Sequence, residues 1–411
     1  MRTQSARHEL GKIANALRRR REELGLGQEE VAEALGVSRE SLAQWERGER
    51  LPPTLHLQGL AQIYGVDEKG LLRGELRYKE ALEVLLPRGL PLSAKARLEL
   101  ERWLGFLDAY ADFLQELGEA LPREIPLKEL RERFLTDVRQ ASSRARAVRE
   151  RLGLGHGALP NLWTLLDGLG VLVYRASLGE GDVPIWGAYY RHPRLGPAIL
   201  VNADSTSGRQ VFTLAHELAH TLYHARLPGI LCRREVIPEE REVEAFANAW
   251  AAHFLVPAPA LRKEAGKLRK LSPEAALFLA SHFGVSYTFI LYRLLNEGLI
   301  TEENLLEWAR ISPNELAVSI GLSAEPFRFP SPTTKGGLHR FPPSVLTRVR
   351  DAVYEGKLSV SEASGLLDVD STTLQRDLLR LPKGAEAEEL GEFDQELRFR
   401  TPGRKPKPLN A

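Results

Sequence analysis

Cysteine and methionine are nearly absent from this chain of 411 residues, which contains one of each. The lone cysteine, Cys232, excludes an intramolecular disulfide framework and fits a reducing cytoplasm. Any metal is therefore expected to be held by His, Asp and Glu. The length predicts two or three domains rather than one, and a content of 43% hydrophobic residues allows each to bury a core.

Long apolar runs and a strong charge of either sign are missing too. Residues 1–20 have no apolar segment of the kind a signal peptide needs. The most apolar later stretch, Ala275 to Leu295, is interrupted by His282, Gly284 and Ser286, which favours a buried pair of helices over a membrane span. We therefore expect a cytoplasmic protein. The net charge of +1 means that any binding to nucleic acid must come from local patches.

Near the N-terminus, short amphipathic helices follow one another over residues 8–74. The segment from Gln28 to Leu35 predicts a helix that stops at Gly36, and Ser38 is a natural N-cap for the next helix, 39–47. Apolar positions anchor this second helix to a core and leave its outer face free. That face carries Arg39, Glu40, Ser41, Gln44 and Arg47, which suit the edges of bases or phosphates in a major groove.

The run QEEVAEALGVSRESLAQWERGERLPP and the later LAQIYGV resemble the Xre family of helix-turn-helix domains. The resemblance implies an all-α, five-helix domain that is commonly dimeric on double-stranded operator DNA. It also implies that Gln28 lies near phosphate and that residues 38–44, beginning with Ser38, face bases. Residues 1–75 contain 12 Lys and Arg against 12 Asp and Glu, so the domain is not basic, and a protein-binding role remains the alternative.

The centre of the chain carries the run HELAH, in which His216 and His220 are four residues apart. This spacing places both imidazoles on one face of a helix, and Glu217 lies beside the first of them. The arrangement is typical of zinc-dependent hydrolysis, although a helix with two unrelated histidines would look the same. A catalytic site also needs a third protein ligand, for which Glu240, Glu242 and Glu244 are candidates.

The run from Glu244 to Pro257 resembles the ExxANxFAAxLLxP pattern of the ImmA/IrrE metallopeptidase family, and FTLAHELAHTLYH resembles its active-site helix. The resemblance implies an α+β, zincin-like fold and a Zn2+ ion held by His216, His220 and Glu244, with Glu217 as general base. Glu242 is the alternative third ligand if the alignment of this run with the family pattern is shifted. His224 lies too far along the helix for the same tetrahedron.

A small sheet is expected before this helix, and it supplies further candidates. Tyr189, Tyr190 and His192 are candidates for stabilising the oxyanion, with no basis for choosing among them. The strand near residues 185–190 is expected to hold an extended substrate by edge pairing.

The C-terminal third repeats the helix-turn-helix pattern at 277–286 and at 358–379, where packing without DNA contact is the alternative. The expected architecture is multidomain and mainly α. The expected parts are a helix-turn-helix domain (1–75), a helical connector (76–139), a metallopeptidase domain (140–305), a helical C-terminal domain with a possible further helix-turn-helix (306–398) and a disordered basic tail (399–411).

These features predict a DNA-binding transcriptional regulator that cleaves a specific protein such as a repressor in a stress response. A homodimer is the candidate assembly. The competing hypothesis is a transcription factor or antitoxin-like repressor whose metal domain senses a ligand or partner with little proteolysis. The intact Glu217 favours cleavage, because a purely structural zinc site needs no base.

Overall fold

The structure is a computed structural model in which most of the chain is described. The described residues are 2–23, 26–64, 82, 85, 92–119, 127, 130, 134–179, 185–224, 227–233, 240–321 and 334–379. They are mainly helical, with one four-stranded mixed sheet, so the predicted fold class is confirmed. The predicted basic tail lies outside the described residues.

The N-terminal helices pack around a small apolar core. They are α1 (Arg2–Glu23), α2 (Gln28–Ala34), α3 (Arg39–Glu46) and α4 (Thr54–Tyr64). Gly36 makes the turn between α2 and α3 with φ of +66°, a conformation that glycine adopts without steric cost. Ser38 caps α3 by accepting a hydrogen bond from Ser41 N at 3.2 Å, as predicted. The fifth helix implied by the resemblance falls after Tyr64, outside the described residues.

The sheet consists of β1 (Leu172–Ala176), β2 (Ile185–His192), β3 (Gly196–Asn202) and β4 (Gly229–Arg233). Its order is β1-β3-β2-β4, with β1 parallel to β3 and the other pairs antiparallel. The expectation that β2 pairs with a substrate was wrong, because both of its hydrogen-bonding sides are taken by β3 and β4. The strand at the outer edge of the sheet, next to β2, is β4.

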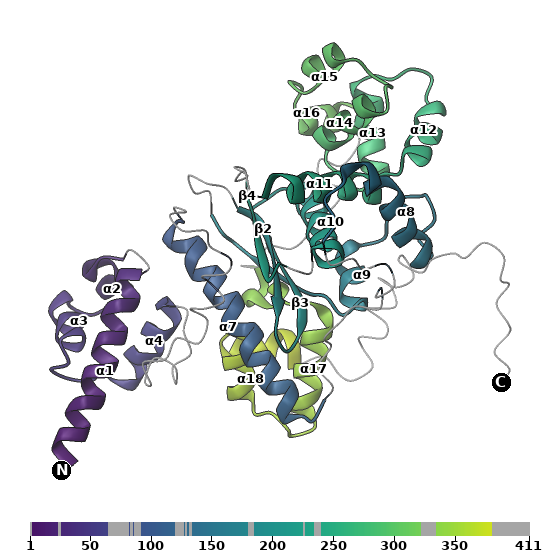
Figure 1. Cartoon of the computed structure of the whole chain (residues 1–411). Helices are drawn as coiled ribbons and strands as arrows, with labels where there is room; N and C mark the ends of the chain where they lie inside the picture. The colour runs from purple at the N-terminus through teal and green to yellow at the C-terminus, as the bar shows by residue number, and fades with distance from the viewer. Residues whose placement is uncertain are drawn as a thin grey trace.

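Both faces of the sheet are buried, and successive side chains alternate between them. Val173, Ile199 and Val201 face the core formed with α10 (Ser207–Tyr223) and α11 (Arg241–Leu255). The opposite set packs against α7 (Ala94–Glu116) and the C-terminal helices, and it includes Tyr174, Ala188, Tyr190, Leu200 and Leu231. Figure 1 shows the sheet between these two helical layers.

The C-terminal helices thus share a core with α7 and the sheet. The elements are η4 (Thr334–Arg340), α17 (Pro343–Tyr354), α18 (Val360–Leu367), α19 (Ser371–Leu374) and the π-helical η5 (Gln375–Leu379). Residues expected to form a connector and residues expected to form a separate domain therefore cover one face of the sheet together.

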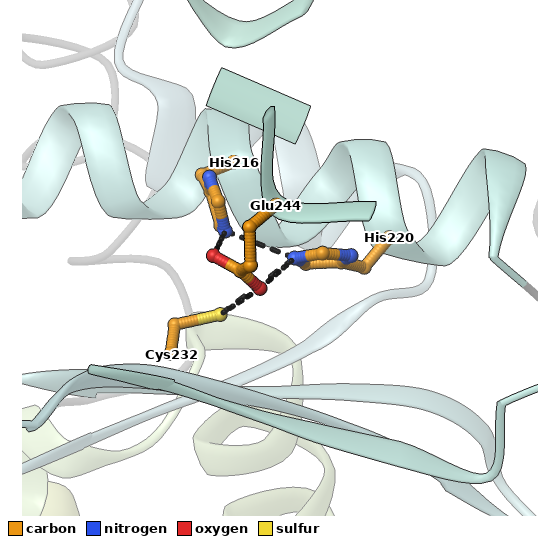
Figure 2. A group of neighbouring side chains, drawn as sticks. All are labelled: His216, His220, Cys232 and Glu244. Carbon is orange, nitrogen blue, oxygen red and sulfur yellow. Dashed lines mark hydrogen bonds and ion pairs between the residues drawn. The ribbon is translucent and has the colours of Figure 1, made fainter. Parts of the chain in front are cut away.

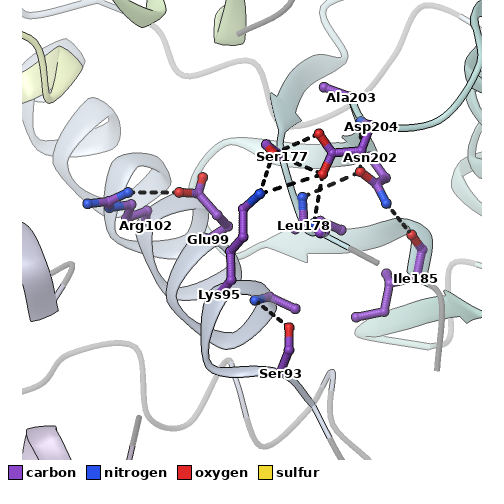
Figure 3. A network of polar contacts seen from close by, with 12 residues as sticks. Ser93, Lys95, Glu99, Arg102, Ser177, Leu178, Ile185, Asn202, Ala203 and Asp204 are labelled. Atoms are coloured by element: carbon purple, nitrogen blue, oxygen red, sulfur yellow. Dashed lines mark hydrogen bonds and ion pairs between the residues drawn. The ribbon is translucent and has the colours of Figure 1, made fainter. Parts of the chain in front are cut away.

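A polar network fixes the start of α7 to the ends of two strands (Figure 3). Lys95 Nζ donates to Ser177 Oγ at 2.6 Å, and Ser177 Oγ donates to Asp204 Oδ1 at 2.7 Å. Asp204 also accepts from Gly179 N at 2.7 Å. Lys95 and Ser177 are 82 residues apart along the chain. Ser177 follows β1 and Asp204 follows β3, so the network ties α7 to the ends of both strands.

Most of the remaining helices contribute apolar side chains to the core on the α10 side of the sheet. They are η2 (Val138–Gln140), α8 (Ala141–Arg151), α9 (Leu162–Gly168), α12 (Ala258–Gly266), α13 (Pro273–Phe283), α14 (Tyr287–Asn296), α15 (Glu302–Trp308) and α16 (Pro313–Ser319). Among the described residues, no single helix has the length and apolarity to cross a membrane. Only α13 and α14 together meet those criteria, and their axes bend by 104°.

The N-terminal domain contacts the rest of the molecule through α7. Leu98 packs against the core of the N-terminal helices. Arg20 on α1 forms an ion pair with Glu101 on α7, and each side chain is only 1% exposed. Arg20 also donates to Tyr64 O at 2.7 Å. The helix that carries this ion pair packs on the sheet face opposite α10.

Candidate metal centre

The helix α10 carries two histidines in buried positions. Small and apolar residues alternate with the histidines along it, so that it packs closely on the sheet and against α11. These residues are Leu214, Ala215, Leu218, Ala219 and Leu222, all at most 1% exposed. His216 and His220 are 5% and 0% exposed, so the predicted pair lies inside the protein rather than on a solvated face.

The side chain of Glu244, from the first turn of α11, meets the two histidines (Figure 2). Glu244 Oε2 lies 3.3 Å from His216 Nε2, and Oε1 lies 3.3 Å from His220 Nε2. The two Nε2 atoms are 2.9 Å apart. Glu242 is exposed and Glu240 pairs with Arg233 at 3.5 Å, so the carboxylate at the centre is that of Glu244.

A fourth group, which the sequence analysis did not expect, reaches the same point. Cys232 Sγ on β4 lies 3.7 Å from His220 Nε2 and 3.8 Å from Glu244 Oε1. The four ligand atoms lie within 4.8 Å of one another. Figure 2 shows the thiol approaching from the sheet, opposite the helix that carries the histidines. The expectation that His, Asp and Glu alone would line the centre was therefore incomplete, because no sequence spacing marks a lone cysteine on a neighbouring strand.

His224 lies outside the cluster, as expected, and determines the tautomer of His220. Its Nε2 lies 2.8 Å from Leu135 O, and since a carbonyl only accepts, that nitrogen carries the proton. His224 Nδ1 is then the acceptor for His220 Nδ1–H, at 2.8 Å. Burial lowers the pKa of His224 to about 3, which keeps this ring neutral. The lone pair of His220 Nε2 is thereby directed into the cluster.

Glu217 is completely buried beside the cluster. Its side chain is 0% exposed, and neither carboxylate oxygen has a hydrogen-bond partner in the described structure. The carboxylate fits against β2 because residue 187 is glycine: a Cβ there would lie 2.9 Å from Glu217 Oε1 and 2.5 Å from Thr213 Cγ2. Burial raises the pKa of Glu217 to about 8, against the opposing effect of His216.

The electrostatics of the cluster favour a bound cation. Burial acts to raise the pKa of Glu244, but the imidazoles of His216 and His220 hold it well below its usual range. Burial raises the pKa of the Cys232 thiol, and the carboxylates of Glu217 and Glu244 raise it further. Nitrogen, oxygen and sulfur donors together with an unpartnered buried carboxylate fit a divalent transition-metal ion.

Two of the three oxyanion candidates were wrong. Tyr190 packs in the core with α7, where its ring contacts Trp103, and His192 Nε2 lies 3.1 Å from Asp108 Oδ1 on α7. Both side chains are therefore on the sheet face opposite the cluster. The alternation along β2 puts Tyr189 on the same face as Gly187 and Glu217.

The predicted DNA-reading face is exposed on α3. Arg39, Glu40 and Arg47 are 64%, 67% and 49% exposed, Ser38 is exposed, and Ser41 and Gln44 are half-buried. The charges on this face are paired, because Arg47 contacts Glu40 at 2.7 Å and Glu49 at 2.6 Å. Gln28 donates to the buried Glu46 at 2.9 Å, so its side-chain amide is already engaged within the domain.

Comparison with known proteins agrees with this geometry. Residues 166–295 match the IrrE N-terminal-like domain, and residues 17–71 match a helix-turn-helix model. The chain carries both domains. The matched IrrE N-terminal-like segment contains all four residues of the cluster and Glu217.

A curated relative is similar to part of the chain. The chain is 37% identical over 79 residues to the HTH-type transcriptional regulator DdrOP3 of Deinococcus deserti. The similarity covers 19% of this chain and 61% of the relative's length. The combination of a helix-turn-helix domain with an IrrE-like domain is consistent with a transcription regulator.

Proposed function

We propose that this protein is a cytoplasmic, DNA-binding transcriptional regulator whose IrrE-like domain is a zinc-dependent endopeptidase. Its substrate is a specific protein partner, such as a repressor, cleaved in a stress response. The observation that carries the proposal is the convergence of the His216, His220 and Glu244 ligand atoms within a few ångströms, beside the buried carboxylate of Glu217.

His216, His220 and Glu244 would hold the ion. When bound, Zn2+ supplies a Lewis acid that makes water more acidic and polarises a peptide carbonyl. The role of Glu217 is to take the proton from the attacking water and to pass it to the leaving amine. Burial raises the pKa of Glu217 to about 8, and a divalent cation bound beside it would favour the ionised carboxylate that a base requires.

The remaining residues orient these groups and exclude water. His224 holds the His220 ring with its Nε2 lone pair inward, and Gly187 leaves space for the carboxylate of Glu217. The edge strand β4 offers the backbone groups with which an extended peptide can pair. Tyr189 is the remaining candidate to stabilise the oxyanion.

The decisive experiment compares the wild type with Glu217→Gln in host cells under stress, with new protein N-termini identified by mass spectrometry. Glu217→Gln keeps the shape of the side chain but removes the base. We expect a small set of cleaved proteins that appears with the wild type and is absent with Glu217→Gln, while zinc content stays equal. If regulation of target genes persists unchanged in Glu217→Gln, the domain senses a ligand or partner instead of cleaving one.

The DNA-binding part is tested separately by binding of the full chain to DNA fragments selected from the host genome. Arg39→Ala removes an exposed side chain and Gln44→Ala a half-buried one from the expected DNA-reading face of α3, and we expect each to weaken selected-site binding by roughly 1 to 3 kcal/mol. Arg139→Ala, at a position 90% exposed on η2, is the matched control for loss of a charge. Equal loss for Arg39→Ala and Arg139→Ala would contradict a specific role for α3.

A further inference from the structure

The lone cysteine of the chain occupies an unusual position. Its thiol faces the two histidines and Glu244 from the sheet, at 3.7 Å from His220 Nε2 and 3.8 Å from Glu244 Oε1. Cys232 lies on β4 and is 3% exposed, whereas the two histidines belong to α10 and Glu244 to α11. The proposed function assigns no role to this sulfur.

These separations agree with those between ligand atoms around one ion. In a tetrahedral zinc site, bonds of about 2.3 Å to sulfur and about 2.1 Å to nitrogen or oxygen place the sulfur about 3.6 Å from its neighbours. The same bonds place nitrogen and oxygen about 3.4 Å apart. The observed distances are 3.7 and 3.8 Å for sulfur, and 3.3 Å from His216 Nε2 to Glu244 Oε2 and from His220 Nε2 to Glu244 Oε1. The two histidine Nε2 atoms are closer, at 2.9 Å, and would have to separate slightly around an ion.

A second observation, the buried carboxylate of Glu217, indicates that the cluster holds a further group. Both carboxylate oxygens of Glu217 are buried without a hydrogen-bond partner in the described structure, next to the same cluster. Buried carboxylates without partners are costly, so a cation or a polar group bound to one belongs beside Glu217. The Cys232 thiol, 3.8 Å from Glu244 Oε1, is near enough to Glu217 for that carboxylate to raise the pKa of the thiol as well.

We propose that Cys232 is a fourth protein ligand, so that the resting metal centre is closed by His216, His220, Glu244 and the Cys232 thiolate. The inference rests on the metal centre of the proposed function. Formation of the bond between sulfur and metal releases the thiol proton to solvent. Structural zinc sites have four protein ligands, whereas catalytic sites keep one position for water. While the thiolate is bound, the resting centre therefore has no position for the water that hydrolysis requires.

The test uses the full chain loaded with Co2+ in place of Zn2+ and read by absorption spectroscopy. A thiolate bound to cobalt gives a sulfur-to-metal charge-transfer band in the near ultraviolet, separate from the visible bands of a tetrahedral cobalt ion. The chain has a single cysteine, so the band can arise only from Cys232. We expect the wild type to show both sets of bands and Cys232→Ser to lose the charge-transfer band while keeping visible ones.

His220→Ala is the control for cobalt bound to the cysteine outside the centre, and it should abolish the charge-transfer band. Persistence of the band in His220→Ala would overturn the inference. A wild type that binds cobalt without a charge-transfer band would also overturn it, while the three-ligand centre of the proposed function would stand. A wild type that binds neither cobalt nor zinc would overturn the proposed function and this inference together.

Discussion

At the scale of single residues, the buried carboxyl of Glu217 makes the stability of the folded state depend on pH. In the metal-free protein its pKa is raised from 4.5 to about 8 by burial. The folded state then holds a proton that the unfolded chain releases above pH 4.5. Its stability should consequently fall as the pH rises from about 4.5 to about 8, with a ceiling of about 5 kcal/mol.

Glu217→Gln has no charge to bury, so we expect it to be more stable than the wild type at pH 8, without metal, and of similar stability at pH 4.5. Urea unfolding at the two pH values measures the difference. The exposed Glu242→Gln is the control and should show no such pH dependence. Added Zn2+ should shrink the advantage of Glu217→Gln, because the cation stabilises the ionised carboxylate. An advantage that is equal at both pH values would contradict this account.

His224 provides a second prediction at this scale. Replacement by Phe removes the acceptor of the His220 Nδ1–H, which then lacks a partner, and the ring loses its fixed tautomer. We expect zinc affinity to fall by roughly 10- to 100-fold, measured by competition with a chelator. His253→Phe, at a half-buried histidine nearer the C-terminal end of α11, should leave the affinity unchanged. Equal affinities for His224→Phe and the wild type would exclude this role.

At the scale of secondary-structure elements, the close approach of α10 to β2 depends on Gly187. A Cβ at this position would lie 2.8 Å from Leu200 O and 2.5 Å from Thr213 Cγ2. The carbonyl belongs to the neighbouring strand and cannot move without distorting the sheet. Gly187→Ala should therefore cost about 1 to 3 kcal/mol of stability, measured by urea unfolding, and displace Glu217.

Gly168→Ala at the end of α9 is the matched control. A Cβ there meets nothing within 4 Å, and alanine is the better helix former, so we expect unchanged or slightly higher stability. If Gly187→Ala is as stable as Gly168→Ala, the contact between helix and strand is looser than the structure indicates.

At the scale of the whole molecule, the buried pair of Arg20 and Glu101 connects the helix-turn-helix domain to α7. Removal of one partner leaves an uncompensated buried charge, so we expect Glu101→Leu to destabilise the contact by about 3 to 5 kcal/mol. The double variant Arg20→Met with Glu101→Leu buries no charge and should recover most of the loss. Thermal unfolding with limited proteolysis after α4 measures both effects.

The exposed pair of Arg18 and Glu22 provides the comparison, because solvent screens this ion pair and Glu22→Leu should leave stability nearly unchanged. Failure of the double variant to recover stability would show that the apolar contact of Leu98, rather than the ion pair, holds the domains together.

Much of the molecule follows from local patterns. The caps and turns of α2 and α3 depend on Gly36 and Ser38, which act within a few residues, so the sequence predicts them. The spacing of His216 and His220 is likewise a property of one helix. The choice of Glu244 among nearby carboxylates came from family resemblance, since spacing alone left Glu240 and Glu242 open.

Other features have no local signal because strands and helices far apart in the chain create them. The thiol of Cys232 reaches the centre only because β4 pairs with β2 beneath α10. Tyr190 and His192 face away from the centre because β2 alternates its side chains between two buried faces. The sequence alone predicts the helix-turn-helix and the residues of the HELAH helix, whereas the strand residues that meet them follow from the pairing of β2, β3 and β4. Side chains on a strand are sorted between faces by pairing and register, which the local pattern of a sheet buried on both sides does not specify.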